Sequence, residues 1–566
     1  MTMITTPVPT TRPPRHPRLL CAAALAAILG LTLPAQTVAQ PIVQAPAPRL
    51  NFSADEMALA RGVARDPGLA SYYGATGLRP LFTAPDAGPR RAALVAAVAQ
   101  APLHGLPEVY DLADLRALQQ APHGPQAEIA FARSFARWTR DVGGGILNPR
   151  QVQPAIKREV VRRPTAVLLR EFAEAPDPAA VLAAVPPQDA GYRALQAALS
   201  AETGPTLSPD VPRVPEGTFS YGTSGPGVLA LRARLAALGF AAASSTPDNF
   251  DAPLAEAVAQ YQQRVGLRPD GVAGPRTVAR LNRGPGQADK RLLVALERMR
   301  WLNGHDLNAR MVWVNLPEYN ARVMEGGRTV FQTRVVIGKD LPTHETPEFS
   351  DEMEHVVVNP RWNVPRSITV TEYLPRLQKN RNAVAHLDVV DSRGRVVSRD
   401  SVDFGRYTAA NFPYRMRQKP SDDNALGEVK FIFPNPWNIY LHDTPSKGLF
   451  NETRRAFSHG CIRVGRPVEL AHELLKGSYA DPTASYARAR ASGNETFLAL
   501  KPTLPVHLVY LTTFADEDGT IRHAPDVYGR DAAVWAGLRK AGVGKSVPAD
   551  ATSSGTGGVE TAALTE

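Results

Sequence analysis

The sequence has 566 residues, of which 44% are hydrophobic and 21% are charged. A chain of this length is too long to fold around one hydrophobic core, so we expect about three or four domains of ordinary globular composition. The net charge of +10 is spread along the chain without a dense Lys/Arg stripe, which argues against nucleic-acid binding. It favours a basic protein that faces an anionic surface or polymer.

Residues 1–39 have the three parts of a secretory signal peptide: a positive region with Arg12, Arg15 and Arg18, an apolar run over 19–33, and small residues that place cleavage after Ala39. A membrane anchor is the alternative interpretation. An apolar run of about 15 residues is, however, shorter than the roughly 20 that span a bilayer. We therefore expect export to the periplasm, with membrane attachment only if the segment is not cleaved.

The chain has two cysteines, Cys21 and Cys461, and cleavage of the signal peptide leaves Cys461 alone. A single cysteine cannot close an intramolecular disulfide, and a stray thiol in an oxidising compartment invites mispairing. A buried, inert cysteine is one alternative. The residues around Cys461 argue instead for a chemical role.

Residues 40–50 form a proline-rich spacer, and 51–215 have the alanine-rich pattern of a helical scaffold domain. In the helix expected over 127–138, apolar residues recur near a 3.6-residue period, which predicts a buried stripe. His104 and His123 lie beside Gly and Pro in apparent loops, so we expect both on the surface rather than as ligands. No catalytic cluster occurs in this region.

Residues 216–285 differ in character and predict a separate domain. An amphipathic helix over 227–240 ends in glycine-containing sequence, and a second helix begins near Pro253. A Gly-Leu-x-x-Asp-Gly-x-x-Gly-x-x-Thr turn then leads to a third short helix, where the Thr277 hydroxyl is placed to help with capping. This turn resembles the three-helix peptidoglycan-binding module, which implies wall binding; a purely architectural module is the alternative.

A linking helix is expected within 286–307, followed by a β-rich catalytic domain over 308–540 with a polar helix-and-loop insertion at 368–425 that we interpret as lid-like. Residues 541–566 have the composition of a disordered tail. The strands expected in the catalytic domain are 310–317, 319–324, 329–337, 354–359, 429–434 and 506–514. The fold class is therefore multidomain α+β.

Two residues of the catalytic domain form a candidate nucleophile pair. His442 follows an expected strand over 438–441, and Cys461 lies at a tight Ser-His-Gly turn before a helical pattern over 468–475. A thiol attacks as thiolate, and a histidine within hydrogen-bond reach can form a thiolate–imidazolium pair before donating its proton to the leaving amine. The spacing therefore indicates acyl transfer by a cysteine.

Other residues of the same turn have candidate roles. The amides of Gly460 and Cys461 are placed to point at a developing oxyanion. Arg463 either holds the turn or binds a substrate carboxylate, and the sequence does not decide between these roles. Zinc bound by two histidines and the cysteine is the competing chemistry, but no further His/Cys cluster lies nearby, so we expect no metal.

The sequence around His442 and the run Ser458-His459-Gly460-Cys461-Ile462-Arg463 resemble the signature of the L,D-transpeptidases of the YkuD type. Nearly the whole mature chain is similar to the large periplasmic YcbB-type enzymes. The resemblance implies Cys461 as nucleophile, His442 as general base and acid, and the backbone carbonyl of Asp443 as the group that orients the imidazole. The residues implied to shape the site are Ser458, His459, Gly460 and Arg463, and those implied to bind substrate are Tyr440, Trp362 and Asn424.

The resemblance also implies a reaction. Cys461 would attack the carbonyl before the terminal D-Ala of a tetrapeptide stem, and the diaminopimelate amine of a second stem would resolve the thioester into a 3→3 cross-link. Carbapenems would acylate the cysteine, and no metal or organic cofactor would be needed. The expected partners are peptidoglycan and cell-wall synthesis proteins, with no nucleic acid. Hydrolysis of stem peptides and a catalytically silent peptidoglycan-binding protein remain alternatives, and the acceptor stays open.

Overall fold

The computed structural model describes residues 51–107, 110, 112–202, 210–265, 267–282 and 289–544. The signal peptide, the spacer and most of the tail predicted at 541–566 lie outside these residues. Within the described ranges, no helix combines the length and the apolar character needed to cross a membrane.

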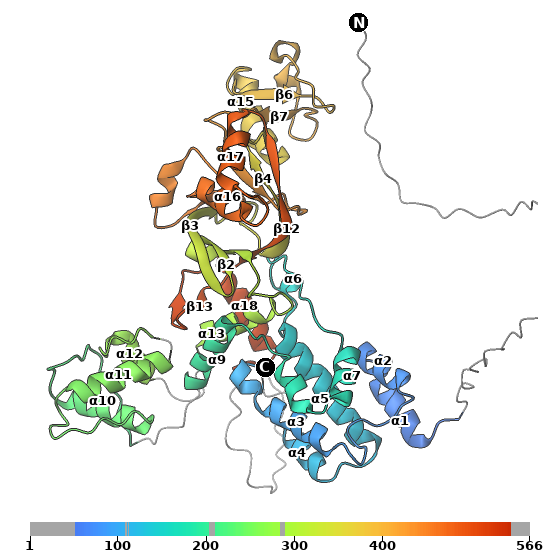
Figure 1. Cartoon of the computed structure of the whole chain (residues 1–566), viewed down its shortest axis with the longest axis vertical. Coiled ribbons are helices and arrows are strands. Elements are labelled where there is room, and N and C mark those ends of the chain that lie inside the picture. Colours follow the sequence, from blue (N-terminus) through green and yellow to red (C-terminus); the bar gives the residue numbers. More distant parts are fainter. Residues whose placement is uncertain are drawn as a thin grey trace, which may run out of the picture. The chain divides into compact units, whose positions relative to one another are not determined.

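The N-terminal region is helical, as the sequence predicts (Figure 1). The helix expected over 127–138 lies inside the 21-residue α5, where Phe131, Phe135 and Trp138 are buried. The helices of the region are α1 (Ala54–Val63), α2 (Pro67–Ala75), α3 (Gly88–Ala99), the 3-10 turn η1 (Ala101–His104), α4 (Leu112–Gln120), α5 (Gly124–Gly144), α6 (Pro149–Val152), α7 (Thr165–Glu174), α8 (Pro178–Ala183) and α9 (Ala190–Glu202).

His104 is not a surface residue, so that prediction is wrong. Its side chain is only 6% exposed, and its Nδ1 lies 3.0 Å from the hydroxyl of Tyr192. Burial, together with the nearby Arg300 guanidinium, lowers the pKa of the His104 imidazole to about 4. The turn η1 packs against α9, and this long-range contact leaves no mark in the local sequence. His123 is exposed, as expected.

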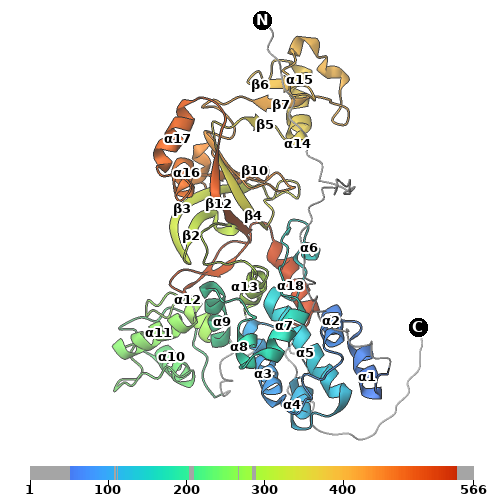
Figure 2. The same ribbon diagram turned by 45° about the vertical axis from the view of Figure 1, so that its right-hand side comes forward.

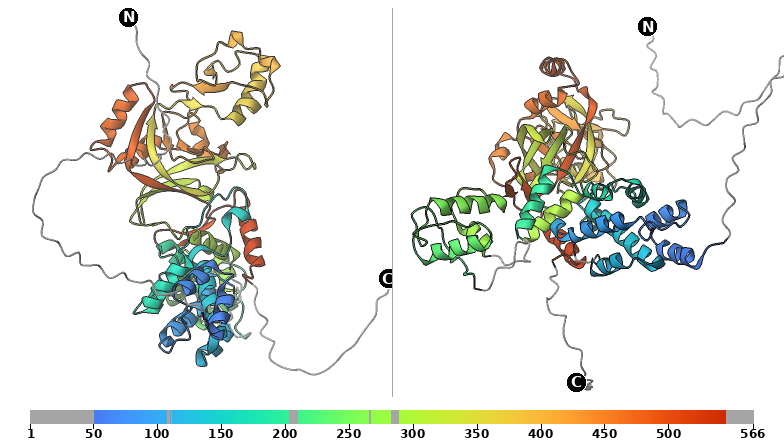
Figure 3. Two further views of the ribbon diagram at one scale, coloured as in Figure 1. Left: turned by 90° about the vertical axis from the view of Figure 1, so that its right-hand side faces the viewer. Right: turned by 60° about the horizontal axis from the view of Figure 1, so that its bottom comes forward.

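The second region contains three helices, α10 (Pro226–Ala237), α11 (Ala252–Arg264) and α12 (Pro275–Leu281), drawn in green in Figure 3. They enclose a small core of their own. The glycine-rich turn requires a glycine at Gly271, whose φ is +70° and whose hypothetical Cβ would meet the Ala255 carbonyl oxygen at 3.1 Å. Thr277 does not cap α12: its buried hydroxyl accepts a 3.1 Å hydrogen bond from the Gln262 side chain.

The third region is built on a nine-stranded mixed sheet with the order β10-β3-β11-β9-β8-β4-β12-β1-β2. Because β2 also pairs with β3, the sheet closes on itself around a buried apolar core. The strands are β1 (Met311–Asn315), β2 (Asn320–Glu325), β3 (Arg328–Gly338), β4 (Phe349–Val358), β8 (Val429–Ile432), β9 (Leu441–His442), β10 (Ala456–Ser458), β11 (Ile462–Val464) and β12 (Thr496–Val509).

Helices α16 (Pro467–Leu475) and α17 (Pro482–Ala491) contact this sheet and each other. The single strand expected over 506–514 is corrected, because β12 ends at Val509 and a separate hairpin of β13 (Thr513–Ala515) and β14 (Ile521–His523) follows. The strand expected over 438–441 is shorter than predicted. Asn438 has a φ of +56°, which excludes it from an extended strand.

The insertion is not purely helix and loop. Residues 368–425 supply β6 and β7 of a three-stranded sheet of order β5-β7-β6 with its own apolar core, while β5 and most of α14 precede residue 368 (Figure 2). The strands are two to four residues long. In β7, charged and buried residues alternate over too few positions for the sequence pattern to distinguish a strand from a loop. The elements are β5 (Trp362–Asn363), α14 (Arg366–Ile368), the π-helical turn η3 (Thr369–Tyr373), α15 (Leu374–Lys379), β6 (Leu387–Val390) and β7 (Arg415–Gln418).

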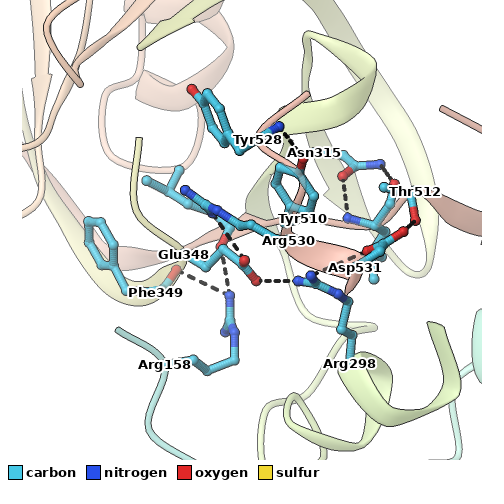
Figure 4. A network of polar contacts seen from close by, with 12 residues as sticks. Arg158, Arg298, Asn315, Glu348, Phe349, Tyr510, Thr512, Tyr528, Arg530 and Asp531 are labelled. Carbon is cyan, nitrogen blue, oxygen red and sulfur yellow. Dashed lines mark hydrogen bonds and ion pairs between the residues drawn. The ribbon is translucent and has the colours of Figure 1, made fainter. Parts of the chain in front are cut away.

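The linking helix is α13 (Lys290–Arg300), which packs against α9 and against the C-terminal helix α18 (Arg530–Lys540). Figure 4 shows the buried charges at this junction, where Arg298 and Arg530 both reach the Glu348 carboxylate, at 2.8 and 3.0 Å. Arg158, in the segment after α6, donates to the Leu508 carbonyl of β12 at 2.7 Å. Buried hydrogen bonds and ion pairs therefore tie the helical region, the linking helix and the sheet together.

Candidate active site

His442 ends β9, and Cys461 directly precedes β11, the neighbouring parallel strand of the large sheet. The register pairs Leu441 of β9 with Ile462 of β11, and both side chains are fully buried in the core. Because side chains alternate along a strand, the flanking residues share the opposite face. Four candidate residues are thereby brought together: Tyr440, His442, Cys461 and Arg463.

The turn before the nucleophile is held by Ser458. Its hydroxyl accepts a 3.1 Å hydrogen bond from the Gly460 N–H and donates to the Cys461 carbonyl. Gly460 has a φ of +117°, a conformation that favours glycine. Since the Gly460 N–H is already occupied, the prediction that it points at an oxyanion is wrong, and the Cys461 N–H stays as the candidate donor.

The Cys461 thiol lies partly exposed in the cleft, with its sulfur 3.5 Å from the Asn438 carbonyl oxygen. Desolvation raises the pKa of the thiol to about 11, and hydrogen bonding from Tyr440 and the positive charge of Arg463 offset this only in part. This direction favours a protonated thiol at rest.

His442 is 5% exposed, and its Nδ1 contacts the backbone carbonyl oxygen of Asp443. A carbonyl only accepts, so Nδ1 carries the proton and Nε2 is left with a lone pair. Burial lowers the pKa of the imidazole to about 3, and the charges of Arg463 and Lys430 act in the same direction. These directions favour a neutral thiol and a neutral imidazole at rest, in place of the thiolate–imidazolium pair expected from sequence.

The carboxylate of Asp443 faces away from the imidazole. One oxygen accepts from the Glu428 N–H at 3.0 Å, and the other pairs with Lys447. The backbone carbonyl is thus the group of Asp443 that contacts His442, in the arrangement that the resemblance implies.

His459 does not contact the imidazole of His442 directly. Its Nε2 lies 2.7 Å from the Glu372 carboxylate of the insertion, and its ring packs 4.6 Å from that of His344. Trp362 is 9% exposed and packs edge-on against Tyr373 at 6.3 Å. His459, Trp362 and Tyr440 all line the cleft.

Asn424 does not line the cleft, so its prediction as a substrate-binding residue is corrected. Its side chain is fully buried, and its amide donates to the carbonyls of Pro360 at 3.1 Å and Lys419 at 2.8 Å. Its oxygen accepts from the Leu426 N–H at 2.9 Å. With both polar groups satisfied, Asn424 has the role of bracing the turn that follows the insertion.

The cleft has a volume of about 930 Å³ and is lined by residues from several separate parts of the sequence. The catalytic motif lines it, Trp362 comes from β5, Glu372 from the insertion, and Lys157 from the segment after α6. Lys157 and Lys430 were missed from sequence, because isolated lysines far from the motif carry no signal. Among the described residues, no group of three or more His, Cys, Asp or Glu is placed to hold a metal ion.

Comparisons with known proteins match three regions of the chain. Residues 309–482 match the L,D-transpeptidase catalytic domain (YkuD), 67–199 match the scaffold domain, and 224–281 match the "putative peptidoglycan binding domain". A curated relative from Haemophilus influenzae, described as "putative L,D-transpeptidase", is 37% identical over 207 residues, which is 36% of this chain. The matched part spans only 41% of that relative's length.

A solved structure of the L,D-transpeptidase (residues 123–326) from Xylanimonas cellulosilytica is 17% identical and covers 53% of this chain and all of its own. Its TM-score is 0.14, so this likeness supports no argument. The family matches confirm the recognition made from the Ser-His-Gly-Cys motif. The chain contains an L,D-transpeptidase catalytic domain of the YkuD family and a peptidoglycan-binding domain.

Proposed function

We propose that the protein is a cysteine-dependent L,D-transpeptidase that forms 3→3 cross-links between peptidoglycan stems in the periplasm. The observation that carries the proposal is the pairing of β9 with β11, which brings His442 and Cys461, the residue before β11, together in a cleft of about 930 Å³. The expected signal peptide and the peptidoglycan-binding domain support the location and the polymer.

In the first half-reaction, the thiol of Cys461 attacks the carbonyl carbon before the terminal D-Ala while Nε2 of His442 accepts the thiol proton. Because both groups rest neutral, deprotonation accompanies attack instead of preceding it. The C–N bond to D-Ala then breaks, the leaving amine takes the proton from His442, and a thioester to Cys461 remains.

In the second half-reaction, the side-chain amine of a neighbouring stem attacks the thioester. His442 accepts a proton from this amine and returns it to the Cys461 sulfur as the thiolate leaves, which restores the resting state. The carbonyl of Asp443 holds Nδ1–H throughout, so Nε2 faces the reacting atoms in both steps. The N–H of Cys461 is the donor we assign to the oxyanion.

Water in place of the amine would make the same site an L,D-carboxypeptidase or endopeptidase, and a free D-amino acid or an anchored lipoprotein would make another product. The cleft contains both positive and negative side chains, and nothing in it favours water over an amine. We therefore keep transpeptidation as the proposal and treat hydrolysis as an outcome of the test.

The test incubates the protein lacking residues 1–39 with disaccharide tetrapeptide and analyses the products by mass. The expected product is a cross-linked dimer with release of D-Ala, absent with Cys461→Ala. Intact-mass analysis after a carbapenem, with and without the same substitution, checks that Cys461 is acylated. A shortened stem without dimer would indicate hydrolysis, and no product with an unlabelled cysteine would support the silent-protein alternative.

A further inference from the structure

The guanidinium of Arg463 lies beside the reacting atoms without a partner. Its Nε is enclosed and makes no hydrogen bond, and among the described residues no carboxylate pairs with its side chain. Arg298 and Arg530 also have an enclosed, unbonded Nε, but their terminal nitrogens pair with Glu348. Arg463 has no such compensation, and therefore does not hold the turn through hydrogen bonds.

A half-buried cation without a counter-charge is costly, and an anionic ligand would remove that cost. The sheet register shows where the ligand would lie. Arg463 of β11 and Lys430 of β8 stand directly opposite His442 on either side. Lys430 already pairs with the Glu495 carboxylate at 3.7 Å. Of the two cations beside His442, Arg463 is therefore the one whose positive charge is not compensated.

The reaction places a specific anion at this position. The leaving amine must reach Nε2 of His442 to take its proton, and in an α-amino acid the carboxylate carbon lies only about 2.5 Å from the amine nitrogen. Neighbouring strands are about 4.8 Å apart, so a carboxylate joined to this amine is within reach of a long side chain on β11. Arg463 lines the cleft at this point.

We propose that Arg463 binds the terminal carboxylate of the leaving D-amino acid, and that it selects donor stems ending at that residue. The assignment rests on the proposed transpeptidase function and deepens it. A guanidinium can bind a carboxylate through two parallel hydrogen bonds, a geometry that an amide-capped or extended stem cannot offer.

The experiment compares two tetrapeptide donor stems that differ only at the last residue, which is D-Ala as free acid or as carboxamide. The rate of acyl-enzyme formation is followed by intact mass, with release of D-Ala or D-alaninamide as second readout. The wild type should favour the acid by roughly 10–100-fold, the range for a hydrogen bond to a charged group. Arg463→Gln should bring this ratio to within about threefold of one, and Arg463→Lys should retain part of it.

The matched control is Arg361→Gln, which removes an exposed arginine from the same cleft and should keep the wild-type ratio. A wild type that accepts acid and carboxamide equally would overturn the assignment without any variant. So would an Arg463→Gln protein with the wild-type ratio, since Arg463 would then act only on Cys461 and His442. A wild type that forms no acyl-enzyme with either stem would overturn the proposed function, and this assignment with it.

Discussion

The hydroxyl of Thr346 donates a 2.7 Å hydrogen bond to the carbonyl oxygen of Gly460, the residue before the nucleophile. The same hydroxyl accepts from the Gly338 N–H at 2.9 Å, so its proton is directed at Gly460. In a planar trans peptide the N–H points opposite to the carbonyl, so this bond also fixes the direction of the Cys461 N–H. Thr346 is therefore a positioning residue for the oxyanion donor.

Thr346→Val should slow acyl-enzyme formation by about tenfold, because loss of one buried hydrogen bond is worth about 1–1.5 kcal/mol and 1.36 kcal/mol is a factor of ten in rate. Alkylation of Cys461 by iodoacetamide forms no oxyanion, so its rate should stay within about twofold. Thr346→Ser should recover most of the acylation rate. The measurement is the ratio of the two rates by intact mass.

The control for this substitution is Thr503→Val, at an exposed position of β12 whose hydroxyl donates to the Glu352 side chain at 2.9 Å. It should leave both rates as in the wild type. Equal slowing of acylation and alkylation by Thr346→Val would show a general disturbance of the turn and contradict the positioning role.

The pKa values of the catalytic pair predict the pH dependence of thiol reactivity. Since the pKa of Cys461 is raised to about 11, the thiolate fraction is small at neutral pH and grows tenfold for each pH unit below that value. Alkylation of the free enzyme should therefore rise about tenfold per unit from pH 6 to 9. A plateau at neutral pH, the sign of a preformed thiolate–imidazolium pair, would contradict this assignment.

The sequence predicted those elements whose pattern depends only on residues close together in the chain. The 3.6-residue period of α5, the glycine-rich turn at Gly271 and the placement of Cys461 after Ser-His-Gly all follow from residues within one or two turns of each other. His442 was expected at the end of a strand, but β11, whose parallel pairing with β9 brings Cys461 to the same face, was not predicted.

Contacts between distant residues could not be predicted in this way. Thr346 lies 114 residues from Gly460 in sequence, and neither residue marks the other. His104 was placed on the surface because its neighbours are turn residues, while the packing that buries it comes from Tyr192, 88 residues away. Asn424 was assigned to substrate by resemblance, and only its hydrogen bonds show that it braces a turn.

The Glu348 carboxylate is the next site for a test of stability. It is 2% exposed and pairs with Arg298 and Arg530, whose side chains are 2% and 0% exposed. Glu348→Gln would remove the counter-charge that two buried cations share, leaving Arg298 with Asp531 at 3.4 Å and Arg530 with Glu345 at 2.9 Å. It should therefore lower the free energy of unfolding by about 3 kcal/mol, the lower end of the cost of breaking a buried ion pair. Thermal unfolding followed by circular dichroism measures this loss.

A matched control is Glu171→Gln, which removes the carboxylate of a half-exposed pair with Arg163. Exposed pairs contribute about 0–1 kcal/mol, so this variant should unfold within a few degrees of the wild type. If both variants lowered the unfolding temperature equally, the ion pairs of Glu348 would contribute no more to stability than an exposed pair.

Gly427 offers a test of the backbone carbonyl that orients His442. Its φ is +60°, and a Cβ there would lie 2.1 Å from the Asp443 carboxylate oxygen that accepts the Glu428 N–H. Gly427→Ala must therefore push Asp443 aside, and its carbonyl would no longer hold the Nδ1–H of His442. We expect acyl-enzyme formation to fall on the order of tenfold or more, since a misoriented base loses its part in both half-reactions. Gly448→Ala is the control, because its Cβ would meet nothing within 4 Å and its φ is not positive. If Gly427→Ala acylates as fast as Gly448→Ala while remaining folded, the Asp443 carbonyl is not what keeps the imidazole in its working tautomer.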